Sequence, residues 1–509
     1  MSLLVTISYG LAALLGAAFA AVELRMLLRF IRNKEAIRGQ AYRESKAVGD
    51  RLKEASAPTV TIQLPLFNER NSADRIIRAA AAQNYPRDRF GIQVLDDSTD
   101  ETTAIVARVV VELQREGVRI SHVHRAHRSG YKAGALAEGL ERSDADFVAV
   151  FDADFAPEAD FLRRLLVESD AFDDPGVAFV QGRWAWGSAD DESWLASILA
   201  LLLDRHFQIQ KPVRAFIGNV TTFNGSGGIW RRAAIDDAGG WASDTLTEDL
   251  DLSYRCALAG WHGRYRHDVP VFNELPGHMR AFKLQQRRWS KGNAQCFRKL
   301  TRRVLGAGKL VEDKWDEAFM LAGYAIHPLL LASLLLWPWA VLYVDRTLFW
   351  ILQGFMSLGI IAAFVSFLMT LKERDQALGV ASLTKVAGSL MVGMGLMVNN
   401  TVGQIQGFVT SGGEFVRTPK LPSRHTDEEI AALGADTPYT SPLHWTFFAE
   451  LGVMAYCFAG AVFLVREGEG LWALAMVFWG LSFALMLQQQ LVREPTAATA
   501  LTSTEVSGA

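Results

Sequence analysis

Three short acidic stretches carry side chains that could do chemistry. Asp96 and Asp97 end an apolar run, Asp152 and Asp154 stand one residue apart in FDADF, and TEDLDL occupies 247–252. Carboxylates that leave a buried strand lose hydration energy unless a cation or hydrogen bonds compensate them. A ligand set made of oxygens alone suits Mg²⁺ or Mn²⁺, which commonly bridge protein carboxylates to substrate phosphates. The pattern therefore indicates a divalent-cation site that takes a phosphorylated substrate.

Each acidic stretch also has a purely structural explanation. Asp, Ser and Thr after a strand can cap a helix, and an isolated DxD occurs by chance in many chains. Thr247 is a good N-cap, and the acidic residues that follow it favour the positive end of a helix. The catalytic interpretation makes one carboxylate of TEDLDL a general base, which requires a desolvated acid near an acceptor hydroxyl. A position at a helix start and a catalytic role can coexist there.

These carboxylates are expected to be positioned by alternating strands and helices. Such alternation predicts a parallel sheet with helices on both faces, which places ligands at the carboxyl ends of its strands. The acidic pairs lie at those ends. Strands are expected at 60–67, 91–97, 118–124 and 146–154, and helices at 73–83, 102–116 and 134–141.

Composition limits the classes of function. Half of the 509 residues are apolar and 21% are charged, and the mean hydropathy is +0.11, which indicates a soluble domain combined with membrane segments. A net charge of −3 argues against nucleic acid as a partner. The three cysteines are far apart and form no CxxC, so neither a disulfide framework nor a thiolate metal site is expected. The catalytic part is then expected in a reducing compartment.

Long apolar runs locate the membrane. About 20 apolar residues in a helix cross the hydrocarbon core of a bilayer, and Leu3–Val22 carries no charge. Arginines and lysines follow this run instead of preceding it, which indicates an uncleaved anchor with the N-terminus outside and the following domain in the cytoplasm. Further spans are expected near 319–344, 348–371, 443–465 and 471–492.

The segment 380–410 is long enough to cross a membrane but contains many polar residues. They are Lys385, Asn399, Asn400, Thr401, Gln404 and Gln406. An amphipathic element in the cytoplasmic interface is the favoured interpretation. Five crossings then leave the C-terminus on the cytoplasmic side. The membrane is expected to be the inner or plasma membrane.

Six motifs in order resemble one known family. They are VLDDSTD, RSGYKAGAL, FDADF, FNGSGGIWR, TEDLDL and QQRRW. Together they resemble the membrane-embedded, processive, inverting members of glycosyltransferase family 2, the cellulose synthase-like enzymes, and in particular the plant A and C groups that make mannan, glucomannan or glucan backbones. The resemblance covers roughly residues 58–300 and implies a GT-A domain, an α/β Rossmann-like nucleotide-diphospho-sugar transferase fold, inserted between transmembrane helices.

The resemblance implies a role for each matched residue. Asp96 and Asp97 would hold the nucleobase and ribose, and Lys132 the diphosphate, for which a point charge is suited. Asp154 would coordinate the metal, with Asp152 nearer the nucleotide. Asp249 would be the catalytic base, with Glu248 beside it among the catalytic residues. Gly225 and Ser226 belong to the FNGSGG loop, which would support the acceptor and whose glycines allow close backbone approach.

QQRRW matches the QxxRW pattern of these enzymes at Gln285, Arg288 and Trp289. The indole can stack on a pyranose ring, and Arg288 can hold the leaving diphosphate through paired N–H donors. Taken alone, a Trp and Arg beside a membrane more often form an interfacial anchor. FVRTPK at 415–420 is similar to the FxVTxK gating loop of cellulose synthases: Phe415, Thr418 and Lys420 match and would contact substrate, whereas Arg417 replaces the family's Val.

The resemblance implies a single displacement with inversion at the anomeric carbon. A nucleotide sugar, UDP-glucose or GDP-mannose, would donate hexose to a growing β-glycan acceptor that is translocated across the membrane. One alternative is a nonprocessive enzyme acting on a lipid such as ceramide or a polyprenyl phosphate, and a remote one is a transporter with a nucleotide-binding domain. Accessory subunits and the choice of donor are not readable from the motifs.

These expectations divide the chain into eight segments. They are an anchor at 1–31, a linker at 32–57, a cytosolic GT-A domain at 58–280, an interfacial QxxRW region at 281–317, two spans within 318–371, an interfacial helix with a gating-like loop at 380–440, two spans within 443–493, and a disordered tail at 494–509.

Overall fold

The computed structural model describes most of the chain. The described residues are 2–46, 57–186, 193–276, 278–308, 314–374, 376–414 and 443–492. The motif at 415–420, with Phe415, Arg417, Thr418 and Lys420, lies outside the described residues, as does the tail expected at 494–509.

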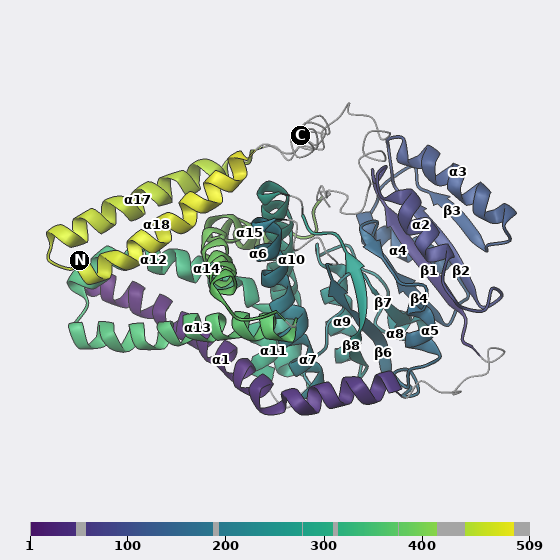
Figure 1. Cartoon of the computed structure of the whole chain (residues 1–509), viewed down its shortest axis with the longest axis horizontal. Coiled ribbons are helices and arrows are strands. Elements are labelled where there is room, and N and C mark those ends of the chain that lie inside the picture. The colour runs from purple at the N-terminus through teal and green to yellow at the C-terminus, as the bar shows by residue number, and fades with distance from the viewer. Residues whose placement is uncertain are drawn as a thin grey trace, which may run out of the picture.

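An eight-stranded sheet forms the centre of the larger domain, on the right of Figure 1. Its strands are β1 (Val60–Leu66), β2 (Phe90–Asp96), β3 (Ile120–His124), β4 (Phe147–Val150), β5 (Phe155–Ala156), β6 (Val177–Ala185), β7 (Gly228–Arg231) and β8 (His262–Asn273). They lie in the order β3-β2-β1-β4-β7-β6-β8-β5. The strands expected at 60–67, 91–97 and 118–124 correspond to β1, β2 and β3, and the stretch 146–154 is a strand only over β4.

The sheet is mixed, which corrects the expectation of a parallel sheet. Strands β3, β2, β1 and β4 are parallel, but β7 is antiparallel to both β4 and β6. Gly228 at the start of β7 pairs with Val150 at the end of β4. Because the chain enters β7 directly from the loop at the carboxyl edge of the sheet, without a crossover to the opposite edge, β7 must run backwards.

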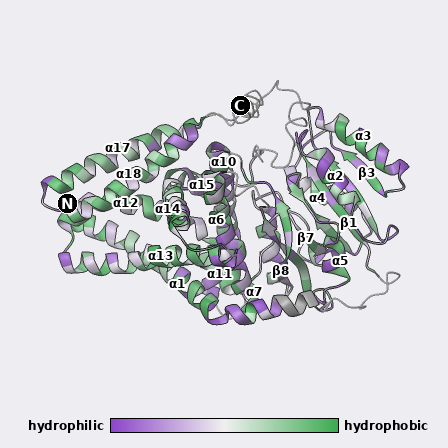
Figure 2. Ribbon diagram, viewed as in Figure 1, coloured by the Kyte–Doolittle hydropathy of each residue, from purple (hydrophilic) through white to green (hydrophobic). Residues whose placement is uncertain are grey.

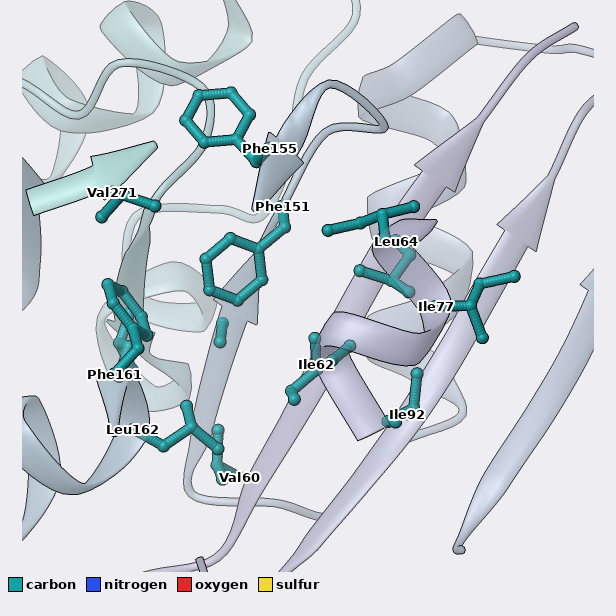
Figure 3. Close-up of a cluster of buried hydrophobic side chains, with 14 of the residues drawn as sticks. Val60, Ile62, Leu64, Ile77, Ile92, Phe151, Phe155, Phe161, Leu162 and Val271 are labelled. Atoms are coloured by element: carbon teal, nitrogen blue, oxygen red, sulfur yellow. The ribbon is translucent and has the colours of Figure 1, made fainter. Parts of the chain in front are cut away.

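Helices cover the sheet and enclose its core. They include α2 (Ala73–Ala81), α3 (Thr102–Arg115), α4 (Tyr131–Glu141), α5 (Phe161–Leu166), α8 (Arg232–Asp237) and α9 (Glu248–Leu258). Figure 3 shows Ile62 of β1 and Phe151, which directly follows β4, facing Ile77 of α2 and Phe161 of α5. Full burial of such a side chain contributes about 1.5–3 kcal/mol, so this cluster fixes the strand ends from which the acidic stretches emerge.

Within the described residues, five helices are long and apolar enough to cross a membrane, and they match the five expected spans. Figure 2 shows their predominantly hydrophobic colouring on the left of the molecule. The helices are α1 (Ser2–Lys46), α12 (Ile326–Tyr343), α13 (Arg346–Glu373), α17 (Thr446–Arg466) and α18 (Gly470–Leu491). Helix α1 continues well beyond its apolar part, through much of the stretch expected as a linker, and runs beneath the sheet domain (Figure 1).

Helices α14 (Val380–Gly395) and α15 (Met397–Val409) form a pair bent by 43°, apolar and long enough together for one broken span or a re-entrant loop. The polar residues that favoured an interfacial helix have a different explanation in the structure. Asn399, Asn400 and Gln404 are buried, and they contact the helix α10 (Met279–Gly306). Their polarity therefore serves packing inside the protein, and the position of this pair relative to the membrane stays a prediction.

Remaining helices connect the sheet domain to the apolar helices. They are α6 (Trp194–Asp204), the π-helical turn η3 (Arg205–Gln210), α7 (Lys211–Phe216), α11 (Lys314–Leu321) and the 3₁₀ turn η4 (Gly323–Ala325).

Candidate active site

A cavity of about 1240 Å³ begins at the carboxyl edge of the sheet and continues among the apolar helices. Most of the predicted site residues line it, although they come from distant parts of the chain. They are Asp97, Lys132, Asp152, Asp154, Gly225, Glu248, Asp249, Gln285, Arg288 and Trp289. Asp96 and Ser226 lie behind this wall and are fully buried.

Asp96, the last residue of β2, is held by hydrogen bonds on both carboxylate oxygens. Its Oδ1 accepts from the backbone N–H of Ser98 at 2.9 Å, and its Oδ2 lies 2.9 Å from His122 Nε2 and 3.3 Å from His124 Nδ1. Burial alone would raise the pKa of Asp96, but the hydrogen bonds from His122 and Ser98 lower it to about 2. Asp96 is therefore ionised, and its carboxylate is hydrogen-bonded inside the protein instead of facing the cavity.

Asp97 faces the cavity but is paired with an arginine. Arg125 donates from Nε to Asp97 Oδ1 at 2.6 Å and from a terminal nitrogen to Oδ2 at 2.5 Å, a bidentate pair. The guanidinium of Arg128 lies 3.3 Å from the ring centroid of Phe67, and both residues line the cavity beside Asp97. This part of the wall offers a flat cationic face next to a fixed carboxylate, which is suited to a planar, polar ligand.

Lys132, on the first turn of α4, links the acidic stretches. Its Nζ lies 2.5 Å from Asp152 Oδ1 and 3.6 Å from Glu248 Oε1, and it donates to the carbonyl of Gly225 at 2.9 Å. Burial alone would lower the pKa of Lys132, but Asp152 and Glu248 raise it overall. The lysine therefore stays charged in the cavity, where it can meet an anionic ligand.

The donor set around Asp154 fits a divalent cation. Four carboxylates line the same cavity, those of Asp152, Asp154, Glu248 and Asp249. Burial lowers the pKa of the Arg288 guanidinium, and these carboxylates partly oppose that decrease. Asp152 Oδ1 lies 2.5 Å from Lys132 Nζ, and Asp154 lines the cavity two residues further along the chain as a second carboxylate that could coordinate an ion. One or two protein carboxylates, completed by water and phosphate oxygens, are typical of Mg²⁺ sites.

Another group of potential ligands lies off the cavity. Among the described residues, the ligand atoms of Asp96, His122 and His124 lie within 4.8 Å of one another. The hydrogen bonds from the imidazoles to Asp96 account for this arrangement. It does not belong to the acidic wall formed by Asp152 and Asp154.

Asp249 stands at the start of α9 in a buried, acidic setting. Burial and the adjacent Glu248 raise its pKa to about 7, and Lys132 opposes this rise. The capping box considered from the sequence is absent, because the Thr247 side chain accepts no capping hydrogen bond. Its Oγ1 instead lies 3.3 Å from Cys296 Sγ on α10. A carboxyl group with a pKa near neutrality beside a cavity can accept a proton at physiological pH.

The loop 223–228 brings backbone close to Asp249. Gly225 has a φ of +78°, and a Cβ added there would lie 3.4 Å from both Asp249 Oδ2 and Lys132 Nζ. The positive φ favours glycine here, and a Cβ would come into van der Waals contact with both charged groups. Ser226 acts from behind, since its Oγ accepts from the backbone N–H of Asp152 at 2.9 Å and so ties the loop to the FDADF turn.

The QxxRW residues lie on α10, which forms the wall facing the apolar helices. Arg288 and Trp289 line the cavity, and Trp289 packs against the hydrophobic core of the sheet domain. Gln285 is buried, and its Oε1 has no hydrogen-bond partner among the described residues. A buried amide oxygen that faces a cavity without a partner is available to a ligand.

The cavity ends among aromatic side chains of the apolar helices. Trp337 of α12 and Trp472 and Trp479 of α18 line it with Tyr9 of α1. The Trp337 ring centroid lies 5.8 Å from that of Trp472 and 5.1 Å from that of Trp479. These aromatic rings line the part of the cavity that lies among the apolar helices.

Sequence reasoning missed three polar groups. Arg125 stands in HVHRAHR next to the expected strand, and a cation so close to two aspartates could have been recognised. The ion pair between Lys283 and Glu450 at 2.7 Å joins α10 to α17, and no local pattern predicts it. Lys211 is buried behind the loop 222–228, where it contacts Thr222, and its surroundings in the sequence carry no motif.

Comparison with known proteins agrees with the sequence motifs. The family model described as "Glycosyltransferase like family 2" matches residues 57–292. Glucomannan 4-beta-mannosyltransferase 2 of Arabidopsis thaliana is 44% identical over 281 residues, which is 54% of this chain and 51% of the relative. Glucomannan 4-beta-mannosyltransferase 1 of Oryza sativa subsp. japonica is 37% identical over 300 residues, 57% of this chain and 56% of the relative. The chain thus spans about half the length of the curated relatives it matches.

Among solved structures, the mannosyltransferase PcManGT from Pyrobaculum calidifontis, in complex with GDP-Man and Mn²⁺, matches with a TM-score of 0.44 at 20% identity. The match covers 76% of this chain and 99% of that one. The sheet domain has a GT-A-like α/β fold, as expected.

Proposed function

We propose that this chain, whose residues 57–292 form a family 2 glycosyltransferase domain, is a membrane hexosyltransferase that extends a β-linked polysaccharide from a nucleotide sugar. One observation carries the proposal. The acidic pair of FDADF, the base candidate Asp249 and the QxxRW helix line a single cavity that continues into the apolar helices. In this proposal the cavity joins a site for glycosyl transfer to the helices that would cross the membrane.

The donor would bind at the edge formed by β2 and α4. Asp97 and the Arg128 face suit the nucleoside, and Lys132 suits the diphosphate because a compact cation binds phosphate as a point charge. Bound Mg²⁺ or Mn²⁺, held by Asp154 with Asp152 beside it, would supply neutralisation of the diphosphate charge. Arg288 faces the same space and can hold the leaving diphosphate through its N–H donors.

The acceptor would bind between Asp249 and α10. Asp249 accepts the proton of the terminal acceptor hydroxyl as that oxygen attacks the anomeric carbon. The carbon–oxygen bond to the diphosphate breaks on the opposite face, so the configuration inverts and a β-linkage forms. Trp289 offers a stacking face for the acceptor sugar, and Gln285 Oε1 offers a hydrogen-bond acceptor.

The curated relatives narrow the sugar to a hexose. Those relatives are named as glucomannan 4-beta-mannosyltransferases, so GDP-mannose and UDP-glucose are the donors to test first. The orientation that fits this function places the sheet domain in the cytoplasm, the N-terminus outside and the product path through the apolar helices. Five helices that could span a membrane support a multi-pass arrangement.

A lipid acceptor is the second candidate. The part of the cavity that lies among the helices is lined by Leu330, Leu390, Met394, Leu474 and Ala475 as well as by aromatic rings, and an acyl or prenyl chain could occupy such a surface. The two candidates differ in the size of their products. Labelled donor offered to the protein in liposomes would yield a polymer in the first case and a lipid carrying one sugar in the second.

Substitution of the proposed base tests the function. We expect Asp249→Asn to bind donor normally and to lose transfer by about 10²–10⁴-fold, because an amide cannot accept the proton. Released nucleotide and labelled product, measured with GDP-mannose and with UDP-glucose, report transfer. Asp244→Asn is the matched control, since Asp244 lies in the same loop region with a side chain 53% exposed. Normal turnover by Asp249→Asn would contradict the assignment.

A further inference from the structure

A second lysine is buried behind the acceptor-side loop. Lys211 is 3% exposed and begins α7, directly after the π-helical turn η3. Its Nζ donates to the Thr222 carbonyl and lies 3.2 Å from Thr222 Oγ1. No carboxylate of the described residues lies within 4.0 Å of this ammonium group. A buried lysine held only by neutral oxygens is costly to the fold, so its position calls for a role.

Lys211 and Lys132 hold the two ends of one short loop. Lys211 binds the carbonyl of Thr222, and Lys132 binds the carbonyl of Gly225 at 2.9 Å. Thr222, Asn224 and Gly225 line the cavity beside Asp249. Between these anchors, the Phe223 N–H donates to Ser253 Oγ at 2.8 Å, and that hydroxyl donates to the Asp249 carbonyl at 2.6 Å. The loop and the first turn of α9 are thereby fixed to each other.

Charged groups from several elements surround this position. Arg214 of α7 and the Tyr265 ring of β8, whose centroid lies 6.0 Å away, face Lys211, and His206 of η3 is close enough for Lys211 to lower its pKa. Burial lowers the pKa of Lys211 to about 7, whereas Asp249 raises it. Asp249 in turn faces Glu248 of its own helix, Lys132 of α4 and Arg288 of α10.

We propose that Lys211 is a positioning residue for the reaction, which holds the Thr222 end of the acceptor-side loop and places a positive charge behind Asp249. The proposal rests on the proposed function, in which Asp249 accepts the acceptor proton. While Lys211 is protonated, its charge favours the carboxylate form of Asp249 over its acid form, so more of the enzyme carries a working base below about pH 7. The hydrogen bond to Thr222 keeps the loop at the distance at which Gly225 passes Asp249.

Three substitutions separate the charge from the hydrogen bond. Lys211→Met removes both, Lys211→Gln keeps a donor for the Thr222 carbonyl without the charge, and Lys211→Arg keeps both. We expect the acid limb of the kcat/KM profile to move upward by about one pH unit in Lys211→Met and Lys211→Gln, as for the loss of one nearby charge at an effective dielectric constant of about 20. At pH 6 this shift corresponds to a rate roughly tenfold below that of the unchanged protein. Lys211→Arg should restore the position of the limb.

The control is Lys299→Met. Lys299 lies 2.8 Å from Asp251 on the same helix as Asp249, but neither residue lines the cavity, so its removal should leave the acid limb in place. Profiles are measured with full-length protein in lipid by release of nucleotide. An unmoved limb in both charge-removing variants overturns the proposal, as does a uniform loss of folded protein in all three Lys211 variants, which would show a structural role alone. If the unchanged protein releases no nucleotide from any sugar donor, the proposed function fails instead.

Discussion

At Asp249 the local environment decides the chemistry. The side chain shares a buried wall with Glu248, which disfavours its charge, and with Lys132, which favours it. Burial is the largest effect and brings the pKa to about 7. An aspartate on an exposed helix start would ionise near pH 4 and would be a weak base. The same Thr-Glu-Asp sequence at an exposed helix start would therefore have only a structural role.

The activity of the unchanged protein should report this pKa. Below about pH 7, Asp249 takes up a proton and can no longer accept one from the acceptor, so we expect kcat/KM to fall about tenfold for each further pH unit. Above pH 7 this limb is flat. The measurement is initial release of nucleotide between pH 5 and 8 at low donor concentration. An acid limb near pH 4 would mean that the base is not raised as the structure indicates.

The sequence motifs predicted which residues line the cavity, but they did not predict the hydrogen-bond partners of those residues. Asp152, Asp154, Asp249 and Trp289 line one cavity as the motifs predicted, although their chemical roles stay predictions. Asp96 was expected to hold the nucleoside, yet it is turned inward towards His122. Sequence spacing cannot distinguish two adjacent carboxylates, because strand geometry sends neighbouring side chains to opposite faces.

The element that carries QxxRW is fixed by close helix packing. Helix α10 lies against α15 at two glycines of α15. A Cβ at Gly403 would stand 2.7 Å from the Arg287 carbonyl oxygen, and a Cβ at Gly407 would collide with the Lys291 carbonyl oxygen. Ser290 donates to the Asn400 carbonyl at 2.7 Å, and Gln404 donates to the Ser290 carbonyl at 2.7 Å. The two glycines allow the approach, and the polar pairs set the register of the helices.

A methyl group at this contact should therefore be harmful. We expect Gly407→Ala to lower the free energy of unfolding by about 1–3 kcal/mol and to reduce transfer, because α10 must shift and carries Arg288 and Trp289 with it. Thermal unfolding in detergent and nucleotide release measure the two effects. Gly452→Ala on α17 is the matched control, since a Cβ there meets nothing within 4 Å. Equal behaviour of the two variants would show that the α10–α15 contact adapts.

Local patterns predicted individual elements better than their partners. The apolar runs gave the five span candidates, and alternation gave β1, β2 and β3. The antiparallel direction of β7 could not be predicted, because it depends on where a distant segment returns to the sheet. The burial of Asn399 and Asn400 of α15 could not be predicted either, because their contacts on α10 are about a hundred residues away in the chain.

In the whole molecule, ion pairs with buried carboxylates join helices α10 and α11 to the apolar helices. Lys283 of α10 contacts Glu450 of α17 and the Gln490 side chain of α18, each at 2.7 Å, and Glu450 is fully buried. At the other side, Asp316 of α11 pairs with Arg25 and Arg29 of α1. The cavity therefore passes between parts that are bound to each other on both sides.

Removal of one partner should be worse than removal of both. We expect Glu450→Leu to lower the free energy of unfolding by about 3–5 kcal/mol, because the Lys283 charge stays buried without its carboxylate. Lys283→Met should have a similar effect, and the double variant should be much less destabilised than the sum of the two. Unfolding midpoints in detergent complete this double-mutant cycle. Additive losses would mean that the two side chains act independently.

The length of α1 limits how this chain can be shortened. At about 1.5 Å per residue, its 45 residues extend over roughly 68 Å, about twice the thickness of a hydrocarbon core. The surplus runs along the sheet domain, and Arg25 and Arg29 of this helix pair with Asp316 of α11, whose side chain is only 2% exposed. Cutting away the first helix to obtain a water-soluble fragment would remove both of these arginines from a buried acid. A shortened form for crystallography should therefore keep α1.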